Sequence, residues 1–381
     1  MERLKEASNI TEFIRQLKNK DIEESAFPQY VDNFIESKAR KCKIPLTGTF
    51  ELTPLCNLNC KMCYVHLNGS QFRESQLISV EIWKSLMKKA HELGMMRATL
   101  TGGECFTYYG FDEIYIYLYN MGIRPTILTN GILAHEKANS LFAQYPPRRI
   151  QVSLYGSSED AYEKITGSRV FHRVLDNILL LKEKNYPVRI AITPSQYMID
   201  DLNALLNVAE RLVVPYGLNS GLIPPRENTG RKINDLTPQQ YLDLYRIKNK
   251  NKLYECIDPT DLPDENHEGA AKFGLNCGGG KSAFCINSDG SMSPCPSLNE
   301  VKTYPLISGF STAWKELNAA VDKYMTPKEC NGCIYYTRCI HCVARHKNAS
   351  KPGHCDTRIC ERTKKLIAAG CLPPPKDIRL K

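Results

Sequence analysis

The chain has 381 residues, of which sixteen are cysteine, and its formal net charge is +9. It is long enough for a barrel-sized domain with a smaller domain beside it. Residues 1–20 are charged throughout and do not resemble a secretory signal, and no run of about 18 apolar residues exists to span a membrane. In a soluble, cytoplasmic setting, dense cysteine indicates metal more often than disulfides. The basic residues form no block interleaved with aromatic residues, so a nucleic-acid partner is not expected.

The first segment, residues 1–43, is expected to be a helical extension. Ile10, Phe13 and Leu17 fall at helical spacing, and Phe34 and Ile35 continue the pattern after a proline. We expect these helices to pack on the outside of the following domain. Docking of a substrate is the alternative for the same surface.

Residues 44–240 alternate predicted strands with predicted helices. The predicted strands are Thr49–Leu55, Arg97–Thr101, Pro125–Thr129, Arg149–Leu154, Val188–Thr193 and Tyr216–Leu222. The predicted helices between them are Val80–Leu93, Phe111–Met121, Leu133–Phe142, Val170–Lys184 and Ile199–Arg211. Six such units are too few to close an eight-stranded barrel, so the predicted fold class is α/β, an open partial (β/α)6 TIM-type barrel. Functional side chains should gather at the carboxyl ends of its strands.

Three cysteines follow the first predicted strand within eight residues. Cys56, Cys60 and Cys63 have the spacing C-x3-C-x2-C. Three thiolates in one loop can hold three irons of a four-iron cube and leave the fourth iron open to a small molecule. A zinc loop or free thiols are the alternatives. The spacing resembles the signature of the radical SAM (S-adenosylmethionine) superfamily, in which the open iron binds the amino and carboxylate groups of SAM.

Residues after the later strands fit the same resemblance. Gly102, Gly103 and Glu104 resemble the family's GGE motif, which binds the methionine amino group of SAM. Family members often have proline next, where this chain has Cys105, which we expect to be a small apolar filler. The resemblance implies further SAM contacts at Asn130 after the third strand, at Ser153 in the fourth strand and at Arg169, which would bind the carboxylate. Two apolar residues, Ile192 and Met62, are expected to contact the adenine. Arg169 is included because Thr166-Gly167 stands where relatives often have Arg-Gly.

A second set of cysteines occupies residues 241–381. Cys277-x12-Gly290-x4-Cys295 contains a predicted hairpin turn at Asp289-Gly290, which would bring the two cysteines toward each other. A run of four cysteines at C-x2-C-x5-C-x2-C spacing follows: Cys330, Cys333, Cys339 and Cys342. Alone, such a run is typical of a zinc ribbon. After a radical SAM core it resembles the SPASM domain, which carries auxiliary four-iron clusters, although relatives have x3 before the last cysteine.

The resemblance implies two auxiliary clusters. One would use Cys330, Cys333, Cys339 and Cys360, with Cys355 competing with Cys360 for the last position. The other would use Cys277, Cys295 and Cys342. Its fourth ligand is left open between Cys285, Cys256 and the substrate. Cys42 and Cys371 fall outside both patterns.

The resemblance also predicts the activity. A flavodoxin or ferredoxin would reduce the first cluster, SAM would split into methionine and a 5′-deoxyadenosyl radical, and that radical would take hydrogen from the substrate. SPASM relatives mostly modify peptides, so we expect crosslink or thioether formation, or a related oxidation, in a ribosomally made peptide. The alternatives are dehydrogenation of a small molecule, a sulfatase-type formylglycine maturase, and a non-catalytic zinc scaffold. The maturase is disfavoured because Pro296 stands where those enzymes have a catalytic aspartate. No protein side chain is assigned a catalytic role.

Overall fold

A single sheet of eight strands organises the protein in this computed structural model. The structure describes residues 10–18, 27–67, 72–219, 221–222, 225–226, 235–250, 275, 277–330, 333–335, 338–339, 342, 344 and 354–372. The strand order is β6-β5-β4-β3-β2-β1-β7-β8. Within these ranges, no helix has the length and apolar character needed to cross a membrane.

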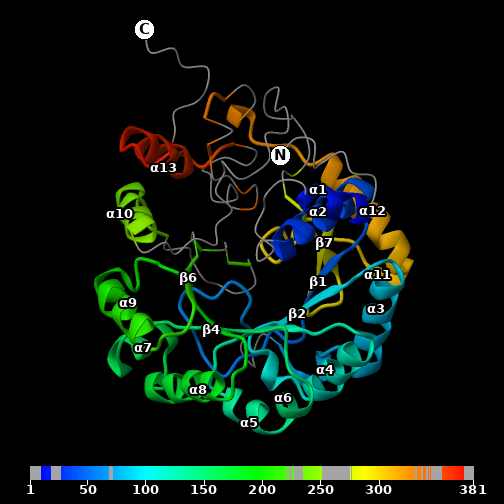
Figure 1. Ribbon diagram of the computed structural model, residues 1–381, viewed down its shortest axis with the longest axis horizontal. Helices are drawn as coiled ribbons and strands as arrows, with labels where there is room; N and C mark the ends of the chain where they lie inside the picture. The colour runs from blue at the N-terminus through cyan, green and yellow to red at the C-terminus, as the bar shows by residue number, and fades with distance from the viewer. Residues whose placement is uncertain are drawn as a thin grey trace.

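Six neighbouring parallel strands form the barrel wall. They are β1 (Thr47–Glu51), β2 (Arg97–Thr101), β3 (Thr126–Thr129), β4 (Arg149–Ser153), β5 (Val188–Ile192) and β6 (Tyr216–Leu218). The helices between them are α3 (Val80–Glu92), α4 (Phe111–Asn120), α5 (Ala134–Asn139), α6 (Leu141–Gln144), α7 (Glu159–Thr166), α8 (Phe171–Glu183) and α9 (Leu202–Arg211). Figure 1 shows these helices as an outer ring around the strands. The predicted open parallel α/β barrel is therefore confirmed.

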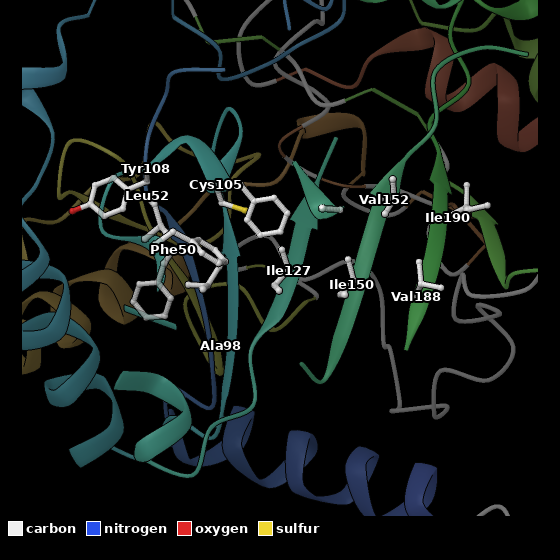
Figure 2. Packing of buried hydrophobic residues seen from close by; sticks show 14 of the residues in the cluster. Phe50, Leu52, Ala98, Cys105, Tyr108, Ile127, Ile150, Val152, Val188 and Ile190 are labelled. Atoms are coloured by element: carbon white, nitrogen blue, oxygen red, sulfur yellow. The ribbon is translucent and has the colours of Figure 1, made fainter. Parts of the chain in front are cut away.

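The core lies between the strands and this ring of helices. Phe50, Ile127, Ile150 and Ile190 have no exposed surface, and Figure 2 shows them on β1, β3, β4 and β5 of the sheet. Phe50 packs edge-on against Trp83 of α3, with ring centroids 6.2 Å apart. Each such fully buried side chain contributes roughly 1.5–3 kcal/mol, so the sheet is a rigid base for the loops at its carboxyl edge.

Two strands from the C-terminal region extend the same sheet. β7 (Ala283–Ile286) pairs in parallel with β1, and β8 (Met292–Ser293) pairs antiparallel with β7. The predicted hairpin is thus present, and it covers the edge of β1 that would otherwise carry unpaired backbone groups. Phe284 of β7 packs against Phe50 at 5.9 Å between ring centroids. The sheet therefore crosses the expected boundary at residue 240.

The remaining helices come before β1 or after β6 in the chain. They are α1 (Ile10–Lys18), α2 (Phe27–Cys42), α10 (Pro238–Lys250), α11 (Pro305–Ser308), α12 (Phe310–Asp322) and α13 (Thr357–Ala368). Four short 3₁₀ turns complete the described elements: η3 (Glu74–Gln76), η4 (Cys105–Thr107), η5 (Ile199–Asp201) and η7 (Lys328–Cys330). Phe13 and Phe34 stack at 4.3 Å and join α1 to α2, and Asp32 of α2 accepts a hydrogen bond from Arg97 of β2 at 2.9 Å. The expected N-terminal helices are present and contact the barrel.

Helix α7 was not expected from the sequence. Its first turn is capped by Ser158, whose hydroxyl accepts a hydrogen bond from the Ala161 amide at 3.2 Å. It ends at Gly167, whose φ of +76° is the left-handed conformation that favours glycine at a helix end. The helix is only eight residues long, so its apolar period is short and easily missed. It supports the loop that carries Cys56, Cys60 and Cys63, which we call the cysteine loop.

Candidate functional site

A cavity of about 530 Å³ opens at the carboxyl edge of the parallel strands. Most of the residues singled out from the sequence of the barrel line it: Cys56, Cys60, Met62, Cys63, Gly102, Gly103, Asn130 and Ser153. These residues follow four different strands, β1 to β4, and parallel strands end at the same edge of a sheet. The topology therefore brings together side chains that are up to 97 positions apart in sequence.

The cysteine loop is held from below by α7. The amide of Asn59 donates to the carbonyl of Thr166 at 3.0 Å, and the amide of Lys61 donates to the carbonyl of Ile165 at 2.9 Å. These bonds satisfy carbonyls at the end of α7 that have no partner within the helix. Thr166 itself is fully buried. The Thr-Gly that replaces the Arg-Gly of many relatives is thus part of the platform under the loop.

Polar hydrogens point at two of the three sulfurs. The Leu58 amide donates to Cys56 Sγ at 3.4 Å, and the His66 amide donates to Cys63 Sγ at 3.2 Å. Asn130 Nδ2 lies 3.7 Å from Cys56 Sγ. Burial raises the pKa of the Cys56 thiol to about 12, so its thiolate requires a compensating positive charge such as a metal. Thiols that line one cavity and accept such bonds fit the donor set of an iron–sulfur cluster.

The two glycines of the Gly-Gly-Glu motif allow β2 to pack against the base of the cysteine loop. A Cβ on Gly102 would lie 2.3 Å from the carbonyl oxygen of Thr53, and one on Gly103 would lie 2.3 Å from that of Leu55. The Gly103 amide donates to the Thr53 carbonyl at 2.7 Å. Any side chain here would push the two loops apart, so the glycines have a structural role besides lining the cavity.

Glu104 points toward β3 and is almost completely buried. Its carboxylate accepts hydrogen bonds from the backbone amide of Asn130 at 2.7 Å and from the Thr129 hydroxyl at 2.9 and 3.0 Å. Burial raises the pKa of this carboxyl, while the hydrogen bonds from Asn130 and Phe106 act in the opposite direction. Cys105 beside it is fully buried in the core. Glu104 is not among the cavity-lining residues here, and it acts on the cavity by positioning Asn130.

Asn130 is engaged with the cysteine loop rather than free in the cavity. Its Nδ2 donates to Asn57 Oδ1 at 2.7 Å, and its Oδ1 accepts from the Ile132 amide at 3.0 Å. Ser153 ends β4 and Met62 lies between the cysteines, and both line the cavity. The side-chain amide of Asn130 therefore ties the end of β3 to the cysteine loop.

Besides Glu104, two further expected SAM contacts, Arg169 and Ile192, do not line the cavity. The side chain of Arg169 is 54 % exposed, and its guanidinium pairs with Glu163 at 3.0 Å and with Asp160. Ile192 has no exposed surface and packs in the core. Successive side chains of a strand face opposite sides, so the members of β5 that face the cavity are Arg189 and Ala191. In this structure the side chains of Arg169 and Ile192 therefore lie outside the lining of the cavity, and their contact with SAM stays a prediction.

The arginine in the cavity is Arg189, which sequence reasoning missed. It lines the cavity together with Gln151, its register partner on β4. Burial and the neighbouring charge of Arg149 both lower the pKa of its guanidinium. The signal that could have found it is the alternation of β5, since an arginine two positions before an inward residue also points inward.

A buried ion pair borders the same cavity. Arg226 Nη2 lies 2.8 Å from both carboxylate oxygens of Glu51 and donates to Asn287 Oδ1 at 3.2 Å. The Arg226 amide donates to the carbonyl of Tyr64 at 3.1 Å, and Tyr64 lines the cavity. Burial raises the pKa of the Glu51 carboxyl against the lowering effect of Arg226. The pair links β1, the cysteine loop and the turn after β7.

The C-terminal cysteines form two groups. In the first, Cys277, Cys295 and Cys342 lie close enough for their charges to act on one another, and burial raises the pKa of Cys295 to about 11. Cys285 is completely buried in β7, between this group and the Glu51–Arg226 pair. Cys256 lies outside the described residues. The proximity of Cys277 and Cys295 agrees with the expected hairpin.

The second group surrounds Cys330. Cys333 and Cys355 pack against Cys330, and Cys339 lies near Cys330 and Cys360. The sulfurs of Cys355 and Cys360 are 3.0 Å apart. The structure thus brings five thiols to one place and does not choose between Cys355 and Cys360. All fifteen described cysteines are free thiols, and no three described His, Cys, Asp or Glu side chains converge as tightly as the ligands of a single metal ion.

Comparison with known proteins shows the class. Residues 50–203 match the family described as the Radical SAM superfamily. The sporulation killing factor maturation protein SkfB of Bacillus subtilis (strain 168) is 25 % identical over 254 residues, which cover 66 % of this chain and 60 % of SkfB. The antilisterial bacteriocin subtilosin biosynthesis protein AlbA of the same organism is 23 % identical over 287 residues, covering 74 % and 62 %. The chain thus spans about three fifths of the length of these two relatives.

A third relative is matched over most of its length, and solved structures share the fold. The AdoMet-dependent heme synthase of Methanosarcina barkeri (strain Fusaro / DSM 804) is 26 % identical over 336 residues, covering 79 % of this chain and 92 % of the relative. SuiB of Streptococcus suis bound to S-adenosylmethionine superposes with a TM-score of 0.64 at 16 % identity, covering 91 % and 85 %. The protein anSMEcpe with AdoMet and a peptide gives 0.65 at 18 %, covering 86 % and 97 %.

These findings confirm the class predicted from the cysteine loop and the barrel. Residues 50–203 match the radical SAM family, in agreement with the class predicted from the three cysteines and the barrel. The second cysteine set and the similarity to SkfB and AlbA agree with the resemblance to SPASM-type members of that superfamily.

Proposed function

We propose that the protein is a radical SAM oxidoreductase that modifies a peptide. The observation that carries this proposal is the single cavity that contains the thiols of Cys56, Cys60 and Cys63 together with Gly102 and Gly103. A small ligand in this cavity would touch both the cysteine loop and the loop that follows β2. That arrangement suits a reaction in which a cluster and its ligand must be held in contact.

The first cofactors are SAM and a [4Fe–4S] cluster on Cys56, Cys60 and Cys63. Cys56, Cys60 and Cys63 would hold this cluster, which, once reduced by a flavodoxin or ferredoxin, would supply the electron for reductive cleavage of SAM to a 5′-deoxyadenosyl radical. The chain contributes the amide hydrogens of Leu58 and His66, which stabilise negative charge on two of the sulfurs. The SAM contacts that we propose on this cavity are Met62, Gly102, Gly103, Asn130 and Ser153, with Glu104 holding Asn130.

We infer two further [4Fe–4S] clusters in the C-terminal region. One would be held by Cys330, Cys333, Cys339 and either Cys360 or Cys355. The other would be held by Cys277, Cys295 and Cys342, with Cys285, Cys256 or the substrate in the fourth position. Ser297, two residues after Cys295, lines the cavity, which supports a role for this second centre in accepting an electron from a substrate in the cavity.

The proposed arrangement of the chain has three parts. Residues 1–43 form the helical extension, residues 44–240 the radical SAM barrel and residues 241–381 the auxiliary region, whose β7 and β8 complete the barrel sheet. The abundance of free thiols supports function in the reducing cytoplasm.

A peptide substrate is supported by what similar proteins are said to bind or make. SkfB is named as a maturation protein and AlbA as a bacteriocin biosynthesis protein. SuiB is solved with its precursor peptide SuiA, and anSMEcpe is solved with a peptide. Modification of a small molecule is the second candidate, because the heme synthase relative is matched over 92 % of its length.

The test uses anaerobically reconstituted protein with SAM and dithionite. We expect 5′-deoxyadenosine to form with the wild type and to be absent with the triple variant Cys56→Ala, Cys60→Ala, Cys63→Ala. The matched control is Cys42→Ala with Cys371→Ala, two thiols outside both C-terminal groups, which should leave the yield unchanged. A colourless protein that contains zinc and forms no 5′-deoxyadenosine would instead establish a non-catalytic scaffold.

A further inference from the structure

We propose that Arg189 binds the carboxylate of SAM. This inference rests on the proposed function and adds to it a residue that neither the family resemblance nor the motifs point to. It starts from a mismatch: Arg169, to which the resemblance gives this role, is paired with Glu163 and Asp160 outside the cavity.

The register of the sheet puts Arg189 on the cavity wall. Arg189 pairs with Gln151, and Ala191 pairs with Ser153, so these four residues form two successive rows on β4 and β5. All four line the cavity. The row of Ser153 is the one nearer the cysteine loop, because it lies at the carboxyl end of β4.

The guanidinium of Arg189 extends toward that nearer row. A Cβ on Gly217 would lie 2.2 Å from Arg189 Nη2 and 3.2 Å from its Cζ. Gly217 pairs with Ala191, so it belongs to the row of Ser153 and Ala191. The side chain therefore spans from its own row to the next, and the absence of a side chain at residue 217 is what leaves room for it.

Charge favours an anion at this point. Of the described residues that line the cavity, Arg189 is the one with a basic side chain. Arg149 adds a second positive charge nearby, and a partly buried guanidinium is stabilised by a negative partner. SAM carries one carboxylate, and the planar guanidinium fork matches a carboxylate with two parallel hydrogen bonds.

The test measures SAM binding to the reconstituted protein by equilibrium dialysis. Losing a charge-assisted hydrogen bond costs about 1.5–3 kcal/mol, so Arg189→Gln should weaken SAM binding about 10- to 100-fold. Arg169→Gln, the matched control outside the cavity, should bind SAM as the wild type does. Arg189→Lys, which keeps the charge but loses the fork, should fall between wild type and Arg189→Gln.

Decarboxylated SAM separates a direct contact from a structural effect. It lacks the group that Arg189 would bind, so wild type and Arg189→Gln should bind it equally. If Arg189→Gln weakens SAM and decarboxylated SAM to the same extent, or leaves SAM binding unchanged, the inference is wrong. Gly217→Ala, which keeps the charge and displaces the guanidinium, should also reduce the preference for SAM; an unchanged preference would count against the inference. A wild type that binds no SAM at all would overturn the proposed function as well.

Discussion

The barrel cavity and the C-terminal cysteine region bring thiols together by different means. In the barrel, Cys56, Cys60 and Cys63 belong to a loop that is hydrogen bonded to α7 and packed on the glycines after β2. In the C-terminal region, the thiols that come together belong to separate segments, such as η7 for Cys330 and α13 for Cys360. We therefore expect the sheet to position the first set before a metal binds, and the second set to depend more on the metal for its structure.

Breaking the link between the two regions should have the largest effect. Arg226 joins Glu51 of β1 to Asn287 in the turn after β7. Arg226→Ala would leave the Glu51 carboxylate buried without this partner, which costs about 3–5 kcal/mol. The urea midpoint of reconstituted protein should fall accordingly. A loss below about 1 kcal/mol would mean that the pair does not hold the regions together, and Arg169→Gln, an exposed pair, is the control with an expected change under about 1 kcal/mol.

A substitution at Gly103 would disturb the barrel site from within. Gly103→Ala places a Cβ against the Leu55 carbonyl, so we expect a loss of about 2 kcal/mol in unfolding free energy and poor cluster assembly on the cysteine loop. Gly122→Ala is the control, since a Cβ there meets no atom within 4 Å and only its positive φ is strained. Equal iron content and stability in both variants would contradict the close packing described here.

Removal of metal should lower the local stability of the C-terminal cysteine region more than that of the barrel. After chelation, the amides of residues 277–295 and 354–372 should exchange hydrogen about tenfold faster or more, equivalent to about 1.4 kcal/mol of local stability. The amides of β2 to β5 should keep their protection, because the barrel core does not depend on metal. Hydrogen exchange with mass spectrometry reads both at once. Equal loss in the barrel would show that the two regions unfold together.

The smallest effect is expected from pH. Burial raises the pKa of Glu104 above its ordinary value of 4.5, so its contribution is present at pH below 4.5 and is lost as pH rises through the raised pKa. Glu104→Gln removes this titration, so the urea midpoint of the variant should decline less than that of the wild type as the pH rises above 4.5. Identical slopes for the two proteins would contradict the assignment.

Local patterns in the sequence predicted most of the barrel. The six strands and the loop of Cys56 were recognisable because apolar periodicity and cysteine spacing are local features. The pairing of β7 with β1 was not, because residues that are more than 200 positions apart determine it. Arg169 and Arg189 show the same limit within the site: a motif can indicate that an arginine is needed, but only the register of β5 shows which arginine faces the cavity.

The most direct test of the account compares variants of the two cysteine sets side by side, measuring iron per chain and 5′-deoxyadenosine. We predict that the Cys56, Cys60 and Cys63 triple variant forms no 5′-deoxyadenosine yet keeps about eight irons, and that Cys330→Ala with Cys339→Ala loses about four irons and still cleaves SAM. Persistent 5′-deoxyadenosine in the triple variant would contradict the central claim that the barrel cavity is the site of SAM cleavage.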